Sequence, residues 1–186
     1  MRVYIDQNVW DFLRKNQIDL LAEFPPSRYS LHIVREQEFE IAPAPDEIRA
    51  FIQSTIERCS VKTSAVFGFY DSSLPPDQQR VAGFGVGEWA GGEQIRFLAD
   101  HGRRVGKELK SKTRLFKNET DLSLGSRAFD SIVLSLDVKA GPIKSAHTEG
   151  GYVVFLNQFD RNEGTLGDQV ESELRSRGVD PSAFKA

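Results

Sequence analysis

Four short apolar runs, separated by stretches of helical periodicity, constrain the fold more than any other feature of this sequence. They lie at 2–5, 29–34, 131–136 and 152–156. The run at 131–136 reads SIVLSL, which is typical of a parallel strand buried on both faces. Strands that alternate with helices predict an α/β fold, a three-layer α/β/α sandwich with a mostly parallel central sheet.

The remaining pattern predicts helices and loops between these strands. Apolar spacing indicates one helix over 9–24, which Pro25 and Pro26 end, and a second helix that begins at Asp46. Further helices are expected at 93–98, 121–129, 142–148 and 166–174, a strand at 65–70, a proline-rich turn at 72–78 and a glycine-rich loop at 83–92. A chain of 186 residues suits one domain over 1–186, with an enlarged middle region at about 60–117.

Composition excludes several classes of protein. Hydrophobic residues make up 39% and charged residues 27% of the chain, which is globular rather than disordered composition. No apolar run approaches the roughly 20 residues that cross a bilayer, so we expect no membrane partner. The opening MRVYID reaches a carboxylate too early for a signal peptide, and a single cysteine excludes a disulfide framework. We therefore expect a soluble, cytoplasmic protein.

The charges are unevenly distributed along the chain. The total is 24 basic against 27 acidic residues, but the segment 103–117 carries seven basic residues and one acidic residue, Glu108. The basic residues are Arg103, Arg104, Lys107, Lys110, Lys112, Arg114 and Lys117. Such a segment attracts a polyanion, and it would lie beside the edge of the sheet that Asp121 approaches. A solvated surface helix or loop is the alternative interpretation.

Acidic residues follow three of the predicted strands. Asp6 follows the first strand, the acids at 36–40 follow the second and Asp137 follows the third, while Asp121 opens the helix that leads into that third strand. Because the carboxyl ends of parallel strands gather at one edge, these carboxylates should meet there and repel one another. A hard divalent cation, Mg²⁺ or Mn²⁺, would neutralise them. Separate, solvated acids on loops are the alternative.

The motifs in this order resemble those of PIN-domain nucleases. The opening YIDQNVW is similar to that family's first motif, an apolar strand followed by D-x-N-V. Asn118-Glu119-Thr120-Asp121-Leu122 looks like its third acid at a helix start, and Ser135-Leu136-Asp137 is similar to its fourth motif. The 16-residue spacing from Asp121 to Asp137 suits one helix and one strand. The resemblance spans 2–156, and the middle of the chain matches poorly.

The resemblance implies a metal-dependent endoribonuclease whose catalytic and metal-binding acids are Asp6, Glu40, Asp121 and Asp137. Glu36 competes with Glu40 for the second position, and Asn8 and Ser135 correspond to polar residues that orient the carboxylates. RNA is then the substrate, and the basic segment is expected to bind it. Small relatives of this family are toxins, so an antitoxin-like partner is considered; a homodimer is left open too.

Two other functions are also compatible with the sequence. The chain could be a PIN-like RNA- or protein-binding module without catalysis. It could also be another α/β enzyme with an acid-bound metal, such as a phosphatase, although Asn8 stands where a phosphoaspartate mechanism would favour a second aspartate. The sequence does not distinguish RNA from DNA as substrate, or one metal ion from two.

Overall fold

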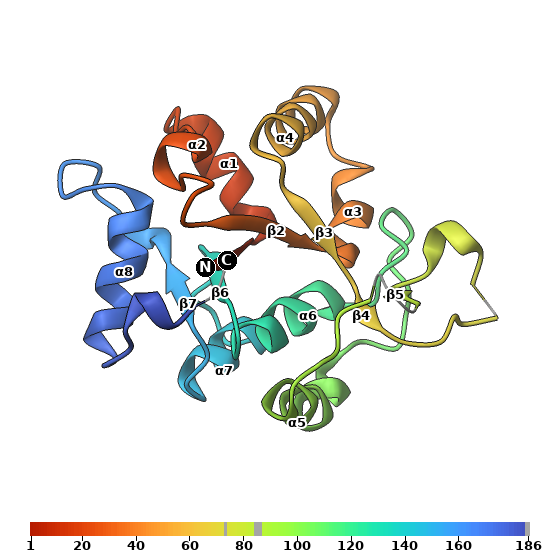
Figure 1. Cartoon of the computed structure of the whole chain (residues 1–186). Helices are drawn as coiled ribbons and strands as arrows, with labels where there is room; N and C mark the ends of the chain where they lie inside the picture. The colour runs from red at the N-terminus through yellow and green to blue at the C-terminus, as the bar shows by residue number, and fades with distance from the viewer. Residues whose placement is uncertain (73, 84–86, 185–186) are drawn as a thin grey trace.

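A five-stranded parallel sheet forms the centre of the molecule (Figure 1). The computed structural model describes residues 1–72, 74–83 and 87–184, and in that part of the chain the strands follow the order β3-β2-β1-β6-β7. They are β1 (Arg2–Ile5), β2 (Ser30–Val34), β3 (Lys62–Ser64), β6 (Ile132–Ser135) and β7 (Val153–Phe155). Every neighbouring pair is parallel. The chain moves outward from β1 in one direction through β2 and β3, and later in the other through β6 and β7, so the order reverses between β1 and β6.

Helices cover both faces of this sheet, so the predicted three-layer α/β/α architecture is confirmed (Figure 1). One face packs against α1 (Gln7–Lys15), α2 (Leu20–Glu23), α4 (Asp46–Cys59) and α8 (Leu166–Ser176). The other face packs against α5 (Gly92–His101), α6 (Glu119–Arg127) and α7 (Pro142–Thr148). The helix α3 (Arg35–Ile41) follows β2 directly, and short 3-10 turns lie at η1 (Pro76–Gln78), η2 (Gly102–Arg104), η3 (Leu156–Gln158) and η4 (Pro181–Ala183).

Strand β1 shows how alternating side chains fill two cores. Val3 and Ile5 point into the core on the α1 side, whereas Tyr4 points into the core on the α6 side, and all three are fully buried. Burial on both faces explains the nearly continuous apolar runs of the central strands. On the α6 side, the absence of a side chain at Gly125 lets the Phe97 ring approach, because a Cβ there would lie 2.9 Å from it.

Several predicted elements are present with small shifts at their ends. The helix at 142–148 matches α7, and those at 46 and 166 match the starts of α4 and α8. The single helix predicted over 9–24 is wrong, because the chain breaks between α1 and α2. Gln17 takes a left-handed φ of 51°, and the Asp19 carboxylate accepts a hydrogen bond from the Leu21 amide, which starts α2.

The enlarged middle region contributes to the central sheet, which its sequence does not indicate. The short polar segment Lys-Thr-Ser forms the edge strand β3, while the strand predicted at 65–70 is reduced to β4 (Val66–Phe67). That strand pairs in parallel with β5 (Val81–Ala82) as a separate two-stranded sheet. The turn and loop predicted at 72–78 and 83–92 fall partly on residues 73 and 84–86, which lie outside the described residues.

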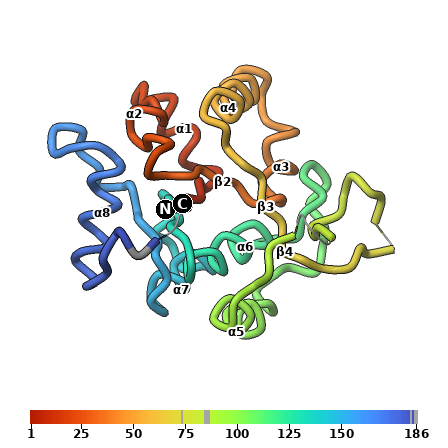
Figure 2. Tube along the Cα trace, viewed as in Figure 1, coloured from red at the N-terminus to blue at the C-terminus, as the bar shows by residue number. Residues whose placement is uncertain are grey.

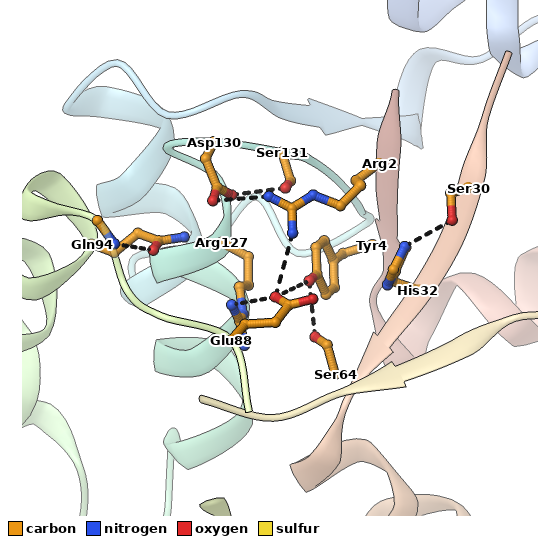
Figure 3. A network of polar contacts seen from close by, with 11 residues as sticks. Arg2, Tyr4, Ser30, His32, Ser64, Glu88, Gln94, Arg127, Asp130 and Ser131 are labelled. Carbon is orange, nitrogen blue, oxygen red and sulfur yellow. Dashed lines mark hydrogen bonds and ion pairs between the residues drawn. The ribbon is translucent and has the colours of Figure 1, made fainter. Parts of the chain in front are cut away.

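A polar network attaches this region to the central sheet (Figure 3). The Glu88 carboxylate accepts hydrogen bonds from Arg127 at 2.8 Å and from the Tyr4 hydroxyl at 3.3 Å, and it lies 3.4 Å from an Arg2 nitrogen. The Tyr4 hydroxyl also shares a hydrogen bond of 2.8 Å with Ser64 of β3. The Arg127 side chain is 2% exposed, so Glu88 neutralises a buried cation.

Within the described residues, none of the helices combines the length and apolar character needed to cross a membrane.

We expect Glu88→Ala to lower the free energy of unfolding by about 2 kcal/mol or more, because it leaves the Arg127 guanidinium buried without its counter-ion. Urea unfolding followed by circular dichroism measures the change. Glu93→Ala is the matched control, since Glu93 forms an exposed pair with Arg96 at 4.0 Å and should contribute below about 1 kcal/mol. Equal losses in the two variants would show that the Glu88–Arg127 pair does not stabilise the fold.

Candidate functional site

Asp6 lies where strand order reverses, directly after β1 and before α1. The residue is 4% exposed, and its carboxylate accepts hydrogen bonds from the Gln7 amide at 2.6 Å, the Asn8 side chain at 2.7 Å and the Ser135 hydroxyl at 2.6 Å. The carboxylate therefore caps the N-terminus of α1 and is fixed in orientation. In open parallel sheets this reversal point, at the carboxyl ends of the strands, is where ligands bind.

Asn8 and Ser135 join the first and last acidic motifs. β1 and β6 are neighbours in register, with Ile5 opposite Leu134. The Asn8 side chain donates to Asp6 and accepts a hydrogen bond from the Leu136 amide at 2.9 Å. The Ser135 hydroxyl donates to Asp6 and accepts from the Asp137 amide at 2.9 Å. These contacts hold the loops that carry Asp6 and Asp137 against each other.

The other three predicted acids approach the same place from different elements. Asp137 follows β6, and its carboxylate accepts a hydrogen bond from the Lys139 amide at 3.0 Å. Asp121 lies in the first turn of α6, and Glu40 lies in the last turn of α3. All three side chains are partly buried. Residues that are up to 131 positions apart in the chain therefore converge at the carboxyl edge of the sheet.

Electrostatic coupling shows that these acids are neighbours. Burial raises the pKa of Asp6 to about 6, and the charge of Asp121 raises it further against the lowering effect of the Ser135 hydrogen bond. Burial raises the pKa of Glu40 to about 7, with contributions from the charges of Asp121 and Asp6. The pKa of Asp121 is raised by burial and by the charge of Asp137. Each carboxylate thus disfavours ionisation of the next one.

Glu36 lies apart from this group, although it is one helical turn from Glu40 on α3. Burial raises the pKa of Glu36 to about 7, and the nearby charges that act on it are those of Glu119 and Arg127. Asp6 and Asp121 act on Glu40 instead. Of the two candidates for the second acid, Glu40 is therefore the one that neighbours Asp6 and Asp121.

The basic segment folds into a hairpin-like loop over 103–117, here called the basic hairpin. Leu109 and Phe116 form an antiparallel bridge, and the Lys110 amide donates to the Leu115 carbonyl at 2.9 Å. All seven basic side chains are exposed. The charge of Lys110 lowers the pKa of both Glu40 and Asp121, so this ammonium group lies close to the acids. Arg104 contacts α7 instead, where it donates to the Ser145 hydroxyl at 2.6 Å.

The donor chemistry of the acid group fits a hard divalent cation. Asp6, Glu40, Asp121 and Asp137 offer carboxylate oxygens, which Mg²⁺ and Mn²⁺ prefer, and their mutual repulsion is what a cation would relieve. The side chains as placed are more widely spaced than a finished ligand cage. In the described part of the chain, no three His, Cys, Asp or Glu side chains form a group that could hold a metal ion. Rotation of these side chains would be needed to bring three of them onto one ion.

Some residues near the site carry no sequence signal that would identify them. Arg80 donates a hydrogen bond to Glu119 at 3.0 Å, and its guanidinium lies 4.8 Å from the centre of the Phe39 ring on α3. Arg35 lies on the same ring, also at 4.8 Å. The two Arg80 contacts connect α3, which carries Glu40, with the start of α6, which carries Asp121. They join residues that are about 40 positions apart and share no motif.

Comparison with known proteins finds no match to this chain among family models, curated proteins or solved structures.

We expect Glu40→Gln to become more stable relative to the wild type as pH rises from 5 to 8. The pKa of Glu40 is about 7 in the folded state, above its ordinary value of 4.5, so the folded protein binds the extra proton in this range. This bound proton stabilises the folded wild type at low pH, and the stabilisation is lost as the carboxyl ionises through pH 7. Glutamine does not ionise, so the variant keeps its stability over the same range. Thermal unfolding of both proteins at several pH values measures the difference.

The difference between the two proteins is the informative quantity, because other groups titrate in the wild type. Burial lowers the pKa of His32 to about 4, and this contributes a slope of the opposite sign. Glu93→Gln, which changes an exposed acid on α5, is the matched control and should give a flat difference. A flat difference for Glu40→Gln as well would contradict burial of this carboxyl among like charges.

Proposed function

We propose that this protein is a Mg²⁺- or Mn²⁺-dependent endoribonuclease with a PIN-like fold. The observation that carries the proposal is the grouping of Asp6, Glu40, Asp121 and Asp137 at the point where strand order reverses. The proposal is further supported by the sequence motifs around these acids and by the parallel α/β sheet. The exposed cations of the basic hairpin supply the attraction for a polyanion that an acidic site lacks.

The four acids would hold the cation, and each supporting residue has a defined task. When bound, the cation offsets charge on the scissile phosphate and lowers the pKa of the attacking water, which suits in-line cleavage of a phosphodiester. Asn8 and Ser135 keep the Asp6 carboxylate in one orientation through their hydrogen bonds. Lys110 keeps positive charge beside Glu40 and Asp121, where it favours their ionised forms and attracts a phosphate.

A second candidate is a PIN-like module that binds RNA or protein without catalysis. The observation that favours it is the absence, within the described residues, of three acids already placed around one point. Isothermal titration with Mn²⁺ separates the two functions, because a degraded site should give no specific binding. An antitoxin-like partner and a homodimer stay predictions.

We expect Asp6→Asn and Asp137→Asn each to reduce RNA cleavage below detection while far-ultraviolet circular dichroism stays unchanged. Each substitution removes one negative oxygen ligand from the proposed cation site but preserves the size of the side chain. Cleavage of a labelled RNA in Mn²⁺ is the measurement, and excess EDTA should abolish it in the wild type. Asp100→Asn, which changes an exposed acid on α5 by the same charge, is the matched control and should keep full activity.

Full cleavage by both variants, or in EDTA, would end the nuclease proposal. A parallel assay on a generic phosphomonoester tests the phosphatase alternative, and hydrolysis of that compound without RNA cleavage would favour it.

We also expect Ser135→Ala to lower cleavage about 10- to 100-fold, the usual range for residues that orient a metal ligand. The substitution removes the donor to Asp6 at 2.6 Å and the acceptor of the Asp137 amide. Initial rates over a range of Mn²⁺ concentrations measure the effect. Ser145→Ala, which removes a hydroxyl on α7 that accepts a hydrogen bond from Arg104, is the control and should stay within a few-fold of the wild type.

A further inference from the structure

A row of aromatic side chains lies exposed beside the basic hairpin. The Phe67 ring stacks on Trp89 with centroids 4.2 Å apart and an interplanar angle of 24°, and Phe69 meets Phe67 edge-on at 6.3 Å. The outer members are open to solvent, since Phe69 is 87% exposed and Trp89 is 72% exposed. Large aromatic rings gathered on a surface in this way mark an interaction site. We call Phe67, Phe69 and Trp89 the aromatic row.

An apolar pocket of about 430 Å³ connects the aromatic row with the basic hairpin. Phe69 and Val81 line it from the side of the small β4–β5 sheet, and Leu109 and Phe116 line it from the hairpin. Its polar lining consists of Asp71, Gln79, Arg80 and Glu119. The volume is within the range of small-ligand sites, which run from roughly 300 to 1,000 Å³. Figure 2 shows the chain between α5 and α6 returning past β4, as this shared lining requires.

Hydrogen bonds fix the polar side chains that line the pocket. Gln79 is 6% exposed, and its side-chain amide accepts from the Asp71 amide at 2.9 Å and donates to the Leu74 carbonyl at 2.8 Å. Arg80 is fixed by Glu119 at 3.0 Å. The Gln79 bonds fix the loop on one side of the pocket, and the Arg80–Glu119 pair joins that side to the start of α6, so a planar ligand would meet a preformed surface.

The combination of exposed rings and excess positive charge identifies one kind of occupant. We propose that the aromatic row and its pocket bind unpaired bases of a single-stranded polynucleotide, whose phosphates contact the basic hairpin. Aromatic stacking together with a basic groove is how proteins bind single strands without regard to sequence. A protein partner fits less well, because charged residues are depleted at the centre of protein–protein interfaces.

The hairpin also connects this surface with the acids, and in this respect the inference rests on the proposed nuclease function. Leu109 lines the pocket, while the next residue, Lys110, acts electrostatically on Glu40 and Asp121. A strand that places a base in the pocket would therefore lead its backbone past Lys110 toward the acid group. The aromatic row thus forms a substrate-holding surface next to the cleavage site.

The test measures binding in EDTA, so that cleavage plays no part. Fluorescence anisotropy of a labelled 12-nucleotide oligoadenylate gives the affinity of the wild type, Phe69→Ala and Ile95→Ala. Loss of one stacking contact should weaken binding about 5- to 10-fold in Phe69→Ala. Ile95 is 57% exposed on α5 and does not line the pocket, so Ile95→Ala should match the wild type.

Tryptophan emission gives a second readout that reports stacking directly. The chain contains two tryptophans, Trp10 at 1% exposure and Trp89 at 72% exposure. Oligoadenylate should quench the emission of the exposed indole, and Trp89→Phe should abolish the quenching while keeping the affinity within about threefold, because phenylalanine also stacks on a base. RNA and DNA forms of the same oligonucleotide are compared, and a blunt duplex of equal charge should bind more weakly than either.

Unchanged affinity in Phe69→Ala, or a duplex that binds as tightly as the single strand, would overturn the inference. The failure of the nuclease proposal would look different. RNA binding that depends on Phe69, together with no cleavage in Mn²⁺, would reject catalysis and keep this surface. Cleavage that needs Asp6 but is indifferent to Phe69 at limiting substrate would reject this surface and keep catalysis.

Discussion

The arrangement of the site depends on the hydrogen bonds that the buried Asp6 carboxylate accepts. It accepts hydrogen bonds from the backbone of α1, from Asn8 and from Ser135, and so joins two neighbouring strands at the point where their order reverses. Burial of a carboxylate is unfavourable unless hydrogen bonds or a cation compensate. Three donors supply part of this compensation, while burial and the charge of Asp121 still raise the pKa of Asp6 to about 6. The fold therefore holds a carboxylate whose charge is incompletely satisfied.

Much of the fold could be predicted because its signals are local. The apolar runs of β1, β2, β6 and β7 and the helix starts at Asp46 and Pro142 depend on residues within one element. The elements that prediction missed depend on distant partners. β3 is a short polar strand that forms by pairing with the edge of β2. The break after Lys15 depends on the left-handed backbone of Gln17, and no nearby proline or glycine predicts it.

The candidate site divides in the same way. Asp6, Asp121 and Asp137 follow or open regular elements, so strand topology alone predicts that they approach one another. The choice between Glu36 and Glu40 could not be made from the sequence, because both lie on the same side of α3 and only the packing of α6 separates their neighbours. The sequence does not predict the proximity of Lys110 to the acids either, since seven similar cations share that segment and its hairpin, with the bridge between Leu109 and Phe116, has no sequence motif.

The junction between the basic hairpin and α6 has a mechanical consequence. The Phe116 amide donates to the Glu119 carboxylate at 2.7 Å, the Gly106 amide donates to the Lys117 carbonyl, and Asn118 takes a left-handed conformation between them. These hydrogen bonds join the base of the hairpin directly to the first turn of α6. Asp121 lies in that turn, so a displacement of the basic hairpin would change the distance between the Asp121 carboxylate and the other three acids.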